Sequence, residues 1–175
     1  MLAVKTNKDF QFKPEVVEQF KQLMAKYPQG QSKSAILAVL HVAQEQNSGW
    51  LSVEVMDEVA HLMNIKPIEV YEVATFYSQF NMKPVGKYVL EVCRTGPCCL
   101  EGAEWLIDYL KMKLNISEGE TTTDGMFTLK PVECLAACGY APMMQIGKTY
   151  FEFLNSEEKV DALLNKLITE AAAKN

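Results

Sequence analysis

The chain has 175 residues, of which 49% are hydrophobic, and a formal net charge of −5. This composition indicates a globular chain with a sizeable core and excludes a disordered or collagen-like one. The acidic balance argues against nucleic acid as the main partner, because phosphate binding needs clustered Lys and Arg. No apolar run reaches the length of a membrane span, and the N-terminus has no secretory or transit pattern, so we expect a cytosolic protein.

Residues 14–80 have the apolar spacing of four short helices joined by tight links, which predicts a small helical bundle. Pro14 suits the first position of a helix, and Pro67 is expected to open the fourth. Ser34 and Ser52 are expected to cap the second and third helices, because a serine side chain accepts a hydrogen bond from a free backbone N–H. The positions that we expect in the core of this bundle are Val16, Phe20, Leu23, Tyr27, Val55, Val59, Met63, Val70, Val73, Tyr77 and Phe80.

The helical spacing of apolar residues ends at residues 80–87, where Pro84 and Gly86 mark a linker. We therefore predict two domains, a helical bundle over residues 1–82 and a second domain over residues 83–175.

The second domain reads as β-α-β-β-β-α, an order typical of an α/β sandwich in which helices pack on a small sheet. A turn at Asp124 and Gly125 is expected before the second strand, and a two-residue hairpin turn at Gly147 joins the last two strands. Asn155 and Glu158 resemble a capping box for the last helix. The expected strands are 88–92, 126–133, 143–146 and 149–153, and the expected helices are 100–114 and 157–171.

Four of the five cysteines follow two of these predicted strands. Cys93 ends the first strand and Cys98 enters the helix after it, while Cys134 ends the second strand and Cys138 lies one turn further on. If the two strands are neighbours in the sheet, both loops meet at one edge of the domain. Four thiolates then converge there with the spacing C-x4-C, a long gap, and C-x3-C.

Three chemistries compete for such a site, and a reducing compartment disfavours structural disulfides. A dithiol redox site requires C-x-x-C, which neither pair has. Structural zinc takes four cysteines, but these gaps are wider than one tetrahedral ion requires. A [2Fe–2S] cluster needs two thiolates for each iron, which one pair per loop can supply. His41 and His61 lie in the helical part, so a Rieske-type centre is not expected; the spacing favours an iron–sulfur cluster and leaves zinc open.

The residues around the thiols support a redox site. We take Cys98 as the ligand and Cys99 as a small buried side chain, because adjacent side chains at a helix start diverge. Gly96 and Gly139 are expected to let backbone N–H groups approach sulfur, or are simply turn residues. Arg94 favours the reduced state if its charge faces the cluster, and is otherwise a solvated side chain.

Three longer stretches extend this pattern: "GKYVLEVCRTGPCCLEGAEWL", "TTTDGMFTLKPVECLAACGYAPMM" and the upstream "GWLSVEVMDEVAHLMNIKPIEVYEVATFYSQFN". From residue 14 to residue 165 the chain thereby resembles the thioredoxin-like [2Fe–2S] subunit of respiratory complex I, the E subunit of its NADH-oxidising arm. Cys99 is not required by that family's pattern.

The resemblance implies a helical N-terminal bundle followed by a thioredoxin-like [2Fe–2S] ferredoxin domain, a fold of the α+β or α/β class. It implies that Cys93 and Cys98 bind one iron and that Cys134 and Cys138 bind the other. The implied function is electron transfer in NADH:quinone oxidoreductase, with no catalysis by the chain alone. The implied partners are a flavoprotein subunit that holds FMN and binds NADH, and a larger iron–sulfur subunit. The implied location is the cytoplasmic face of the inner membrane, reached only through the complex.

Other functions remain possible for a chain with this sequence pattern. The same module resembles subunits of NAD-reducing hydrogenases and NAD-dependent formate dehydrogenases, and a four-cysteine zinc scaffold that serves only assembly is a further alternative. The chain has no G-x-G-x-x-G and no P-loop, so we expect it to bind neither NADH nor FMN by itself. Phe76 lies off the apolar stripe of its predicted helix and is the expected contact residue for a partner.

Overall fold

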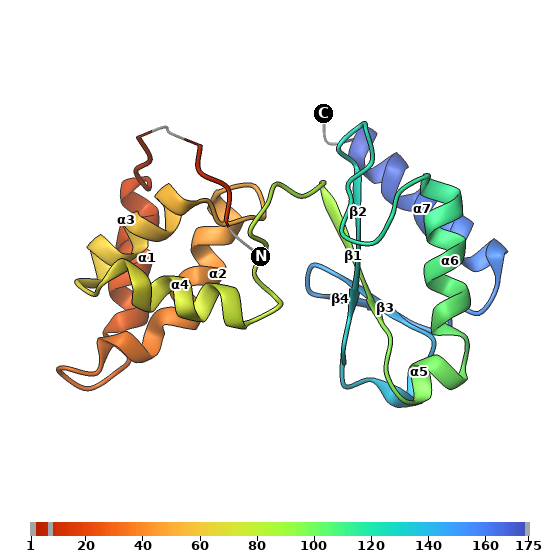
Figure 1. The fold of residues 1–175 in the computed structure, drawn as a ribbon, viewed down its shortest axis with the longest axis horizontal. Helices are drawn as coiled ribbons and strands as arrows, with labels where there is room; N and C mark the ends of the chain where they lie inside the picture. Colours follow the sequence, from red (N-terminus) through yellow and green to blue (C-terminus); the bar gives the residue numbers. More distant parts are fainter. Residues whose placement is uncertain (1–2, 7–8, 174–175) are drawn as a thin grey trace. The chain divides into compact units, whose positions relative to one another are not determined.

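The computed structural model describes residues 3–6 and 9–173. The chain divides into two compact units, Met1–Pro84, called here the helical unit, and Val85–Asn175, called the sheet unit. Figure 1 shows that the first unit contains helices and the second contains the strands.

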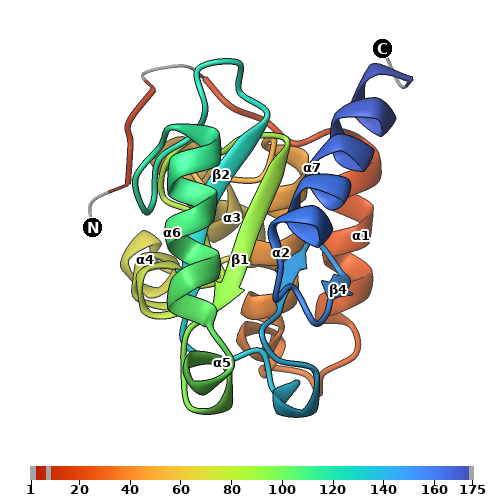
Figure 2. The same ribbon diagram turned by 90° about the vertical axis from the view of Figure 1, so that its right-hand side faces the viewer.

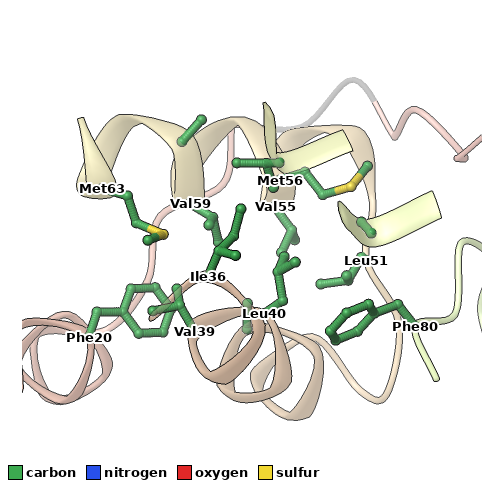
Figure 3. Packing of buried hydrophobic residues seen from close by; sticks show 14 of the residues in the cluster. Phe20, Ile36, Val39, Leu40, Leu51, Val55, Met56, Val59, Met63 and Phe80 are labelled. Carbon is green, nitrogen blue, oxygen red and sulfur yellow. The ribbon is translucent and has the colours of Figure 1, made fainter. Parts of the chain in front are cut away.

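The helical unit is built around α2, which contacts α1, α3 and α4. Side chains from all these helices form one buried cluster, part of which is drawn in Figure 3. Phe20, Leu40 and Met56 are among its fully buried members, and burying a side chain of this size contributes roughly 1.5–3 kcal/mol. The helices are α1 (Pro14–Met24), the 3-10 helix η1 (Ser32–Ala35), α2 (Ile36–Gln46), α3 (Val53–Met63) and α4 (Pro67–Phe76).

Three of the predicted helix starts are confirmed and one is wrong. Pro14 is the first residue of α1. Ser52 caps α3 by accepting a hydrogen bond from the N–H of Val55 at 3.3 Å, and Pro67 is the first residue of α4. Ser34 does not cap α2, because it lies inside η1 and the helix begins only after Ala35. The extra 3-10 turn leads directly into α2 and leaves no extended cap residue before it.

Most of the expected bundle core is buried, Leu23 and Val73 are half-buried against it, and two tyrosines are exposed. Tyr27 lies beyond the end of α1 and Tyr77 beyond the end of α4, and 40% of each is exposed. Both helices end before the predicted apolar spacing does, so these residues leave the buried face. Phe80 also lies outside α4, yet its ring is buried in the cluster.

The sheet unit contains one four-stranded mixed sheet in the order β2-β1-β3-β4. Strand β1 pairs with β2 in parallel and with β3 antiparallel, and β3 pairs with β4 antiparallel. Helices α6 and α7 cover one face of this sheet, and their apolar side chains share a core with those of the strands (Figures 1 and 2). The elements are β1 (Tyr88–Cys93), α5 (Pro97–Leu100), α6 (Ala103–Leu114), β2 (Phe127–Val132), the 3-10 helix η2 (Cys138–Tyr140), β3 (Met144–Ile146), β4 (Thr149–Phe151) and α7 (Glu157–Ala172).

Alternation along β1 determines which face is buried. Leu90 and Val92 point into the core beneath the helices and are fully buried. Glu91, between them, points to the other face, where it forms an ion pair of 3.6 Å with Lys130 of β2. The sheet is therefore apolar toward α6 and α7 and carries charge on its opposite side.

Two details of the sheet unit differ from the sequence prediction. The helix expected over 100–114 is divided into α5 and α6 at Gly102, whose φ of +101° suits glycine. The N-cap residue of α7 is Ser156, not Asn155, and its side chain makes no capping hydrogen bond. Asn155 accepts a hydrogen bond of 2.8 Å from Lys159. The expected turn at Asp124 and the hairpin that joins β3 to β4 are confirmed. Among the described residues, no helix is both long enough and apolar enough to cross a membrane.

Candidate iron–sulfur cluster site

The site lies at the edge of the sheet where β1 and β2 end. Because the two strands run parallel, with Cys93 opposite Val132, the loops that follow them begin side by side. The condition on which the sequence argument depended, that these two strands are neighbours in the sheet, is therefore met. The first loop leads into α5, which lies at the end of β1 in Figure 1 and contacts η2, the turn that begins with Cys138.

Cys93 and Cys98, called here the first cysteine pair, are buried, with exposed fractions of 4% and 1%. They pack in a small cluster against Ala103 of α6, Ala141 and Met143. The core of the sheet unit thus fixes the position of both thiols through ordinary packing.

The two buried thiols differ in their electrostatic surroundings. Burial raises the pKa of Cys98 to about 12, and the adjacent Cys93 and the charge of Cys138 act in the same direction. Burial also raises the pKa of Cys93, but backbone hydrogen bonds from Leu135 and Thr95, together with side-chain hydrogen bonds from Cys98 and Thr95, outweigh it and lower this pKa. A negatively charged sulfur is therefore best accommodated at Cys93, and metal ligands must be thiolates.

Cys134 and Cys138, the second cysteine pair, are exposed. The N–H of Ala136 donates a hydrogen bond of 3.3 Å to Cys134 Sγ. Ala136 has a φ of +56°, a left-handed conformation that costs a residue with a Cβ roughly 1–2 kcal/mol. Leu135 and Ala137 of this loop pack against the cluster that contains the first cysteine pair, and backbone hydrogen bonding orients the loop around its sulfur.

Hydrogen bonds from residues outside the cysteine pairs join and support the two loops. The hydroxyl of Thr95 in the first loop donates a hydrogen bond to the carbonyl oxygen of Glu133 in the second. The N–H of Arg94 donates to the carbonyl oxygen of Val132 at 3.0 Å, which extends the pairing of β1 with β2 by one residue. The hydroxyl of Tyr150 on β4 donates to the carbonyl oxygen of Leu135 at 2.8 Å.

Sequence reasoning did not single out Thr95 or Tyr150. The sequence could have indicated a role for Thr95, since a hydroxyl side chain in a turn commonly forms a hydrogen bond with the nearby backbone. Tyr150 had none, because its contact with the second loop depends on how β3 and β4 pair across the sheet.

Cys99 is not the small buried side chain that the sequence predicted. It is exposed, and its thiol donates a hydrogen bond of 2.9 Å to the carbonyl oxygen of Arg94. Helix α5 is one turn long, so only one of two adjacent cysteines turns into the core, and that residue is Cys98.

The structure shows the backbone conformation and surroundings of Gly96 and Gly139 and the ion-pair partner of Arg94. The φ of +44° at Gly96 requires glycine for backbone conformation. A Cβ at Gly96 or Gly139 would meet no heavy atom within 4 Å among the described residues, so neither glycine serves a close approach to another part of this chain. The guanidinium of Arg94 forms an ion pair of 3.0 Å with Glu118.

The donor chemistry fits a cysteine-ligated cluster. Two loops present two thiols each at one sheet edge, and a [2Fe–2S] cluster takes its ligands as one pair per iron. Backbone N–H groups that hydrogen bond sulfur, as at Cys134, stabilise negative charge there. Among the residues that the structure describes, no group of three or more His, Cys, Asp or Glu side chains is arranged to hold a metal ion.

A small sheet with helices on one face and two pairs of cysteines at one edge fits the class of cysteine-ligated iron–sulfur proteins. The chain belongs to the thioredoxin-like [2Fe-2S] ferredoxin family, which it matches over residues 20–168. The thioredoxin-like fold, the [2Fe–2S] cofactor and the family that the sequence resembled are thereby confirmed.

Two curated relatives illustrate the similarity. The chain is 42% identical over 165 residues to the E subunit of NADH-quinone oxidoreductase from Rickettsia typhi, and the match covers 94% of this chain and 96% of the relative. It is 44% identical over 154 residues to a mitochondrial protein of Dictyostelium discoideum, NADH dehydrogenase [ubiquinone] flavoprotein 2, covering 88% of this chain and 62% of that one.

Among solved structures, the chain is similar to an NAD+-reducing [NiFe]-hydrogenase, with a TM-score of 0.66 and 23% identity. The match covers 77% of this chain but only 23% of the hydrogenase chain. At this identity the likeness supports the fold alone.

Proposed function

We propose that this protein is the electron-transfer subunit of an NADH:quinone oxidoreductase and that Cys93, Cys98, Cys134 and Cys138 hold its [2Fe–2S] cluster. The observation that carries the proposal is the parallel pairing of β1 with β2, which brings the two thiol-bearing loops to one edge in a member of this family. We assign the first cysteine pair to one iron and the second cysteine pair to the other.

A bound [2Fe–2S] cluster takes up and returns one electron at a time. The chain's own residues supply its ligands and its surroundings. The first cysteine pair is shielded from water by Ala103 and Met143, whereas the second is open to solvent and to a partner. The N–H of Ala136 stabilises added negative charge at Cys134.

We propose that the protein works as a subunit and catalyses no reaction alone. Its proposed partners are a flavoprotein subunit that holds FMN and binds NADH, and a larger iron–sulfur subunit. Phe76, of which 80% is exposed at the end of α4, is the proposed contact residue in the helical domain of residues 1–82. Attachment to the cytoplasmic face of the inner membrane would then be indirect, through the complex.

A second setting is a hydrogenase that reduces NAD, since the fold is similar to that of such an enzyme. The curated relatives favour the quinone oxidoreductase, because the subunit from Rickettsia typhi shares 42% identity over a match that covers 94% of this chain. Purification of the tagged protein from its native cells separates the two settings. Recovery of hydrogenase subunits in place of a quinone-reducing complex would contradict our proposal.

Metal and sulfide analysis of the isolated chain tests the cofactor and its ligands. We expect a red-brown protein with about two irons and two acid-labile sulfides per chain, and a rhombic electron paramagnetic resonance signal on reduction. A colourless protein that carries zinc and no sulfide would instead identify a zinc scaffold.

A further inference from the structure

The single peptide unit between Leu135 and Ala136 is bonded at both ends. Its carbonyl oxygen accepts the 2.8 Å hydrogen bond from the Tyr150 hydroxyl. Its N–H donates the 3.3 Å hydrogen bond to Cys134 Sγ. Because a trans peptide is planar, its C=O and N–H point in opposite directions, and fixing one fixes the other.

We infer that Tyr150 is a positioning residue for the cluster: it holds the Leu135–Ala136 peptide so that its N–H points at Cys134 Sγ and raises the reduction potential. This inference rests on the proposed function, because it requires Cys134 to be a cluster ligand.

The backbone conformation explains why this peptide needs to be held. Ala136 has a φ of +56°, which is unfavourable for any residue with a Cβ. Rotation of the peptide toward a more favourable conformation would carry the N–H away from the sulfur. Tyr150 lies on β4, which is held by its pairing with β3, so its hydrogen bond to Leu135 opposes that rotation.

Polarisation of the peptide by the two hydrogen bonds also raises the reduction potential. A carbonyl that accepts a hydrogen bond makes the N–H of its own peptide a better donor. One-electron reduction adds one negative charge to the cluster and its thiolates, and N–H donors to sulfur stabilise that charge. Removal of the phenol hydroxyl should therefore lower the reduction potential without removing a ligand.

The test compares the full-length, cluster-loaded chain with its Tyr150→Phe variant, which keeps the aromatic ring. Tyr140→Phe is the matched control, because Tyr140 lies in η2 beside the second cysteine pair and its hydroxyl bonds no other described residue. Midpoint potentials are measured by redox titration, with the reduced cluster followed by electron paramagnetic resonance.

For Tyr150→Phe we expect the ratio of reduced to oxidised cluster at the wild-type midpoint to fall about threefold to tenfold, or about 28 to 59 mV. Tyr140→Phe should leave the potential unchanged. A Tyr150→Phe variant with the wild-type potential, or an equal shift in both variants, would overturn the inference while leaving the proposed function intact. A wild-type chain without iron and sulfide would overturn both.

A second measurement decides the question if Tyr150→Phe assembles too little cluster for titration. Amide hydrogen exchange at Ala136 is compared in the cluster-free full chains. We expect exchange about fivefold faster in Tyr150→Phe than in wild type, because the peptide is no longer held. Equal exchange rates would contradict the positioning role.

Discussion

The two cysteine pairs of this protein carry the same side chain but differ in their exposure to solvent. The first pair is buried in the apolar cluster that includes Ala103 and Met143, whereas the second is exposed on a loop shaped by backbone hydrogen bonds. The first pair is thus positioned by the packing of the core. The loop of the second pair packs Leu135 and Ala137 against that core and is also held by polar contacts from Thr95 and Tyr150. The proposed ligand set therefore combines a shielded half with an accessible half.

The difference has a consequence for stability. A change in the first cysteine pair should disturb both the cluster and the fold, because each thiol is also a core side chain. A change in the second should disturb the cluster alone. The predictions that follow test this separation.

The largest effect is expected on cluster content. Cys134→Ser should reduce the iron of the purified chain from about two atoms to a small fraction of that, because one iron loses a thiolate ligand. Cys99→Ser is the matched control, since Cys99 is an exposed cysteine in the other loop. It should retain full iron, as measured by metal analysis. Loss of iron in Cys99→Ser with retention in Cys98→Ser would show that the ligand in α5 was assigned to the wrong residue.

The next effect concerns the fold without its cluster. Cys98→Ser places a hydroxyl at a position that is 1% exposed, and a buried polar group without a good partner costs about 1–3 kcal/mol. Cys134→Ser, at an exposed position, should change the free energy of unfolding by no more than about 0.5 kcal/mol. Urea unfolding of the cluster-free chains measures both values. Equal destabilisation by the two substitutions would mean that burial does not distinguish the pairs.

A smaller effect is expected from the hydrogen bond that joins the two loops. Thr95→Val removes the donor to the carbonyl oxygen of Glu133 and should cost about 0.5–1.5 kcal/mol in the free energy of unfolding. Thr95→Ser keeps the hydroxyl and should recover most of that loss. The rate of iron release to a chelator gives a second measurement, which should rise in Thr95→Val only. If both variants release iron at the wild-type rate, this bond does not hold the loops together.

The smallest effect is expected from the ion pair between Arg94 and Glu118. Both side chains are substantially exposed, so Glu118→Gln should cost no more than about 0.5 kcal/mol, and added salt should reduce the difference further. Thermal or urea unfolding at two salt concentrations provides the measurement. A loss that exceeds about 1 kcal/mol and persists at high salt would contradict this assignment of a weak surface pair.

Local patterns in the sequence predicted much of the secondary structure. Proline at a first helical position and serine at a cap marked α4 and α3, because their effects act within one turn of the chain. The apolar spacing did not predict where the helices end. Tyr27 and Tyr77 continue the helical spacing of apolar residues beyond α1 and α4, but periodicity does not record where the backbone stops being helical.

The candidate site was predictable in part. The grouping of four cysteines after two strands was visible in the sequence, but only the structure shows that those strands pair in parallel. The burial of Cys99 was wrong, because one short helical turn decides which of two adjacent cysteines faces the core. The contact of Tyr150 with Leu135 could not be predicted, since it joins residues on different elements.

By itself, the sequence determined the kind of donor, the grouping of the donors in two pairs and the family to which the chain belongs, because these depend on residue identity and spacing. Only the tertiary structure decided that the first pair is buried and the second exposed, and which hydroxyl groups hold the loops. The physical reason is that burial and hydrogen bonding between loops depend on which elements pack together, and residues distant in the chain meet only in the folded state.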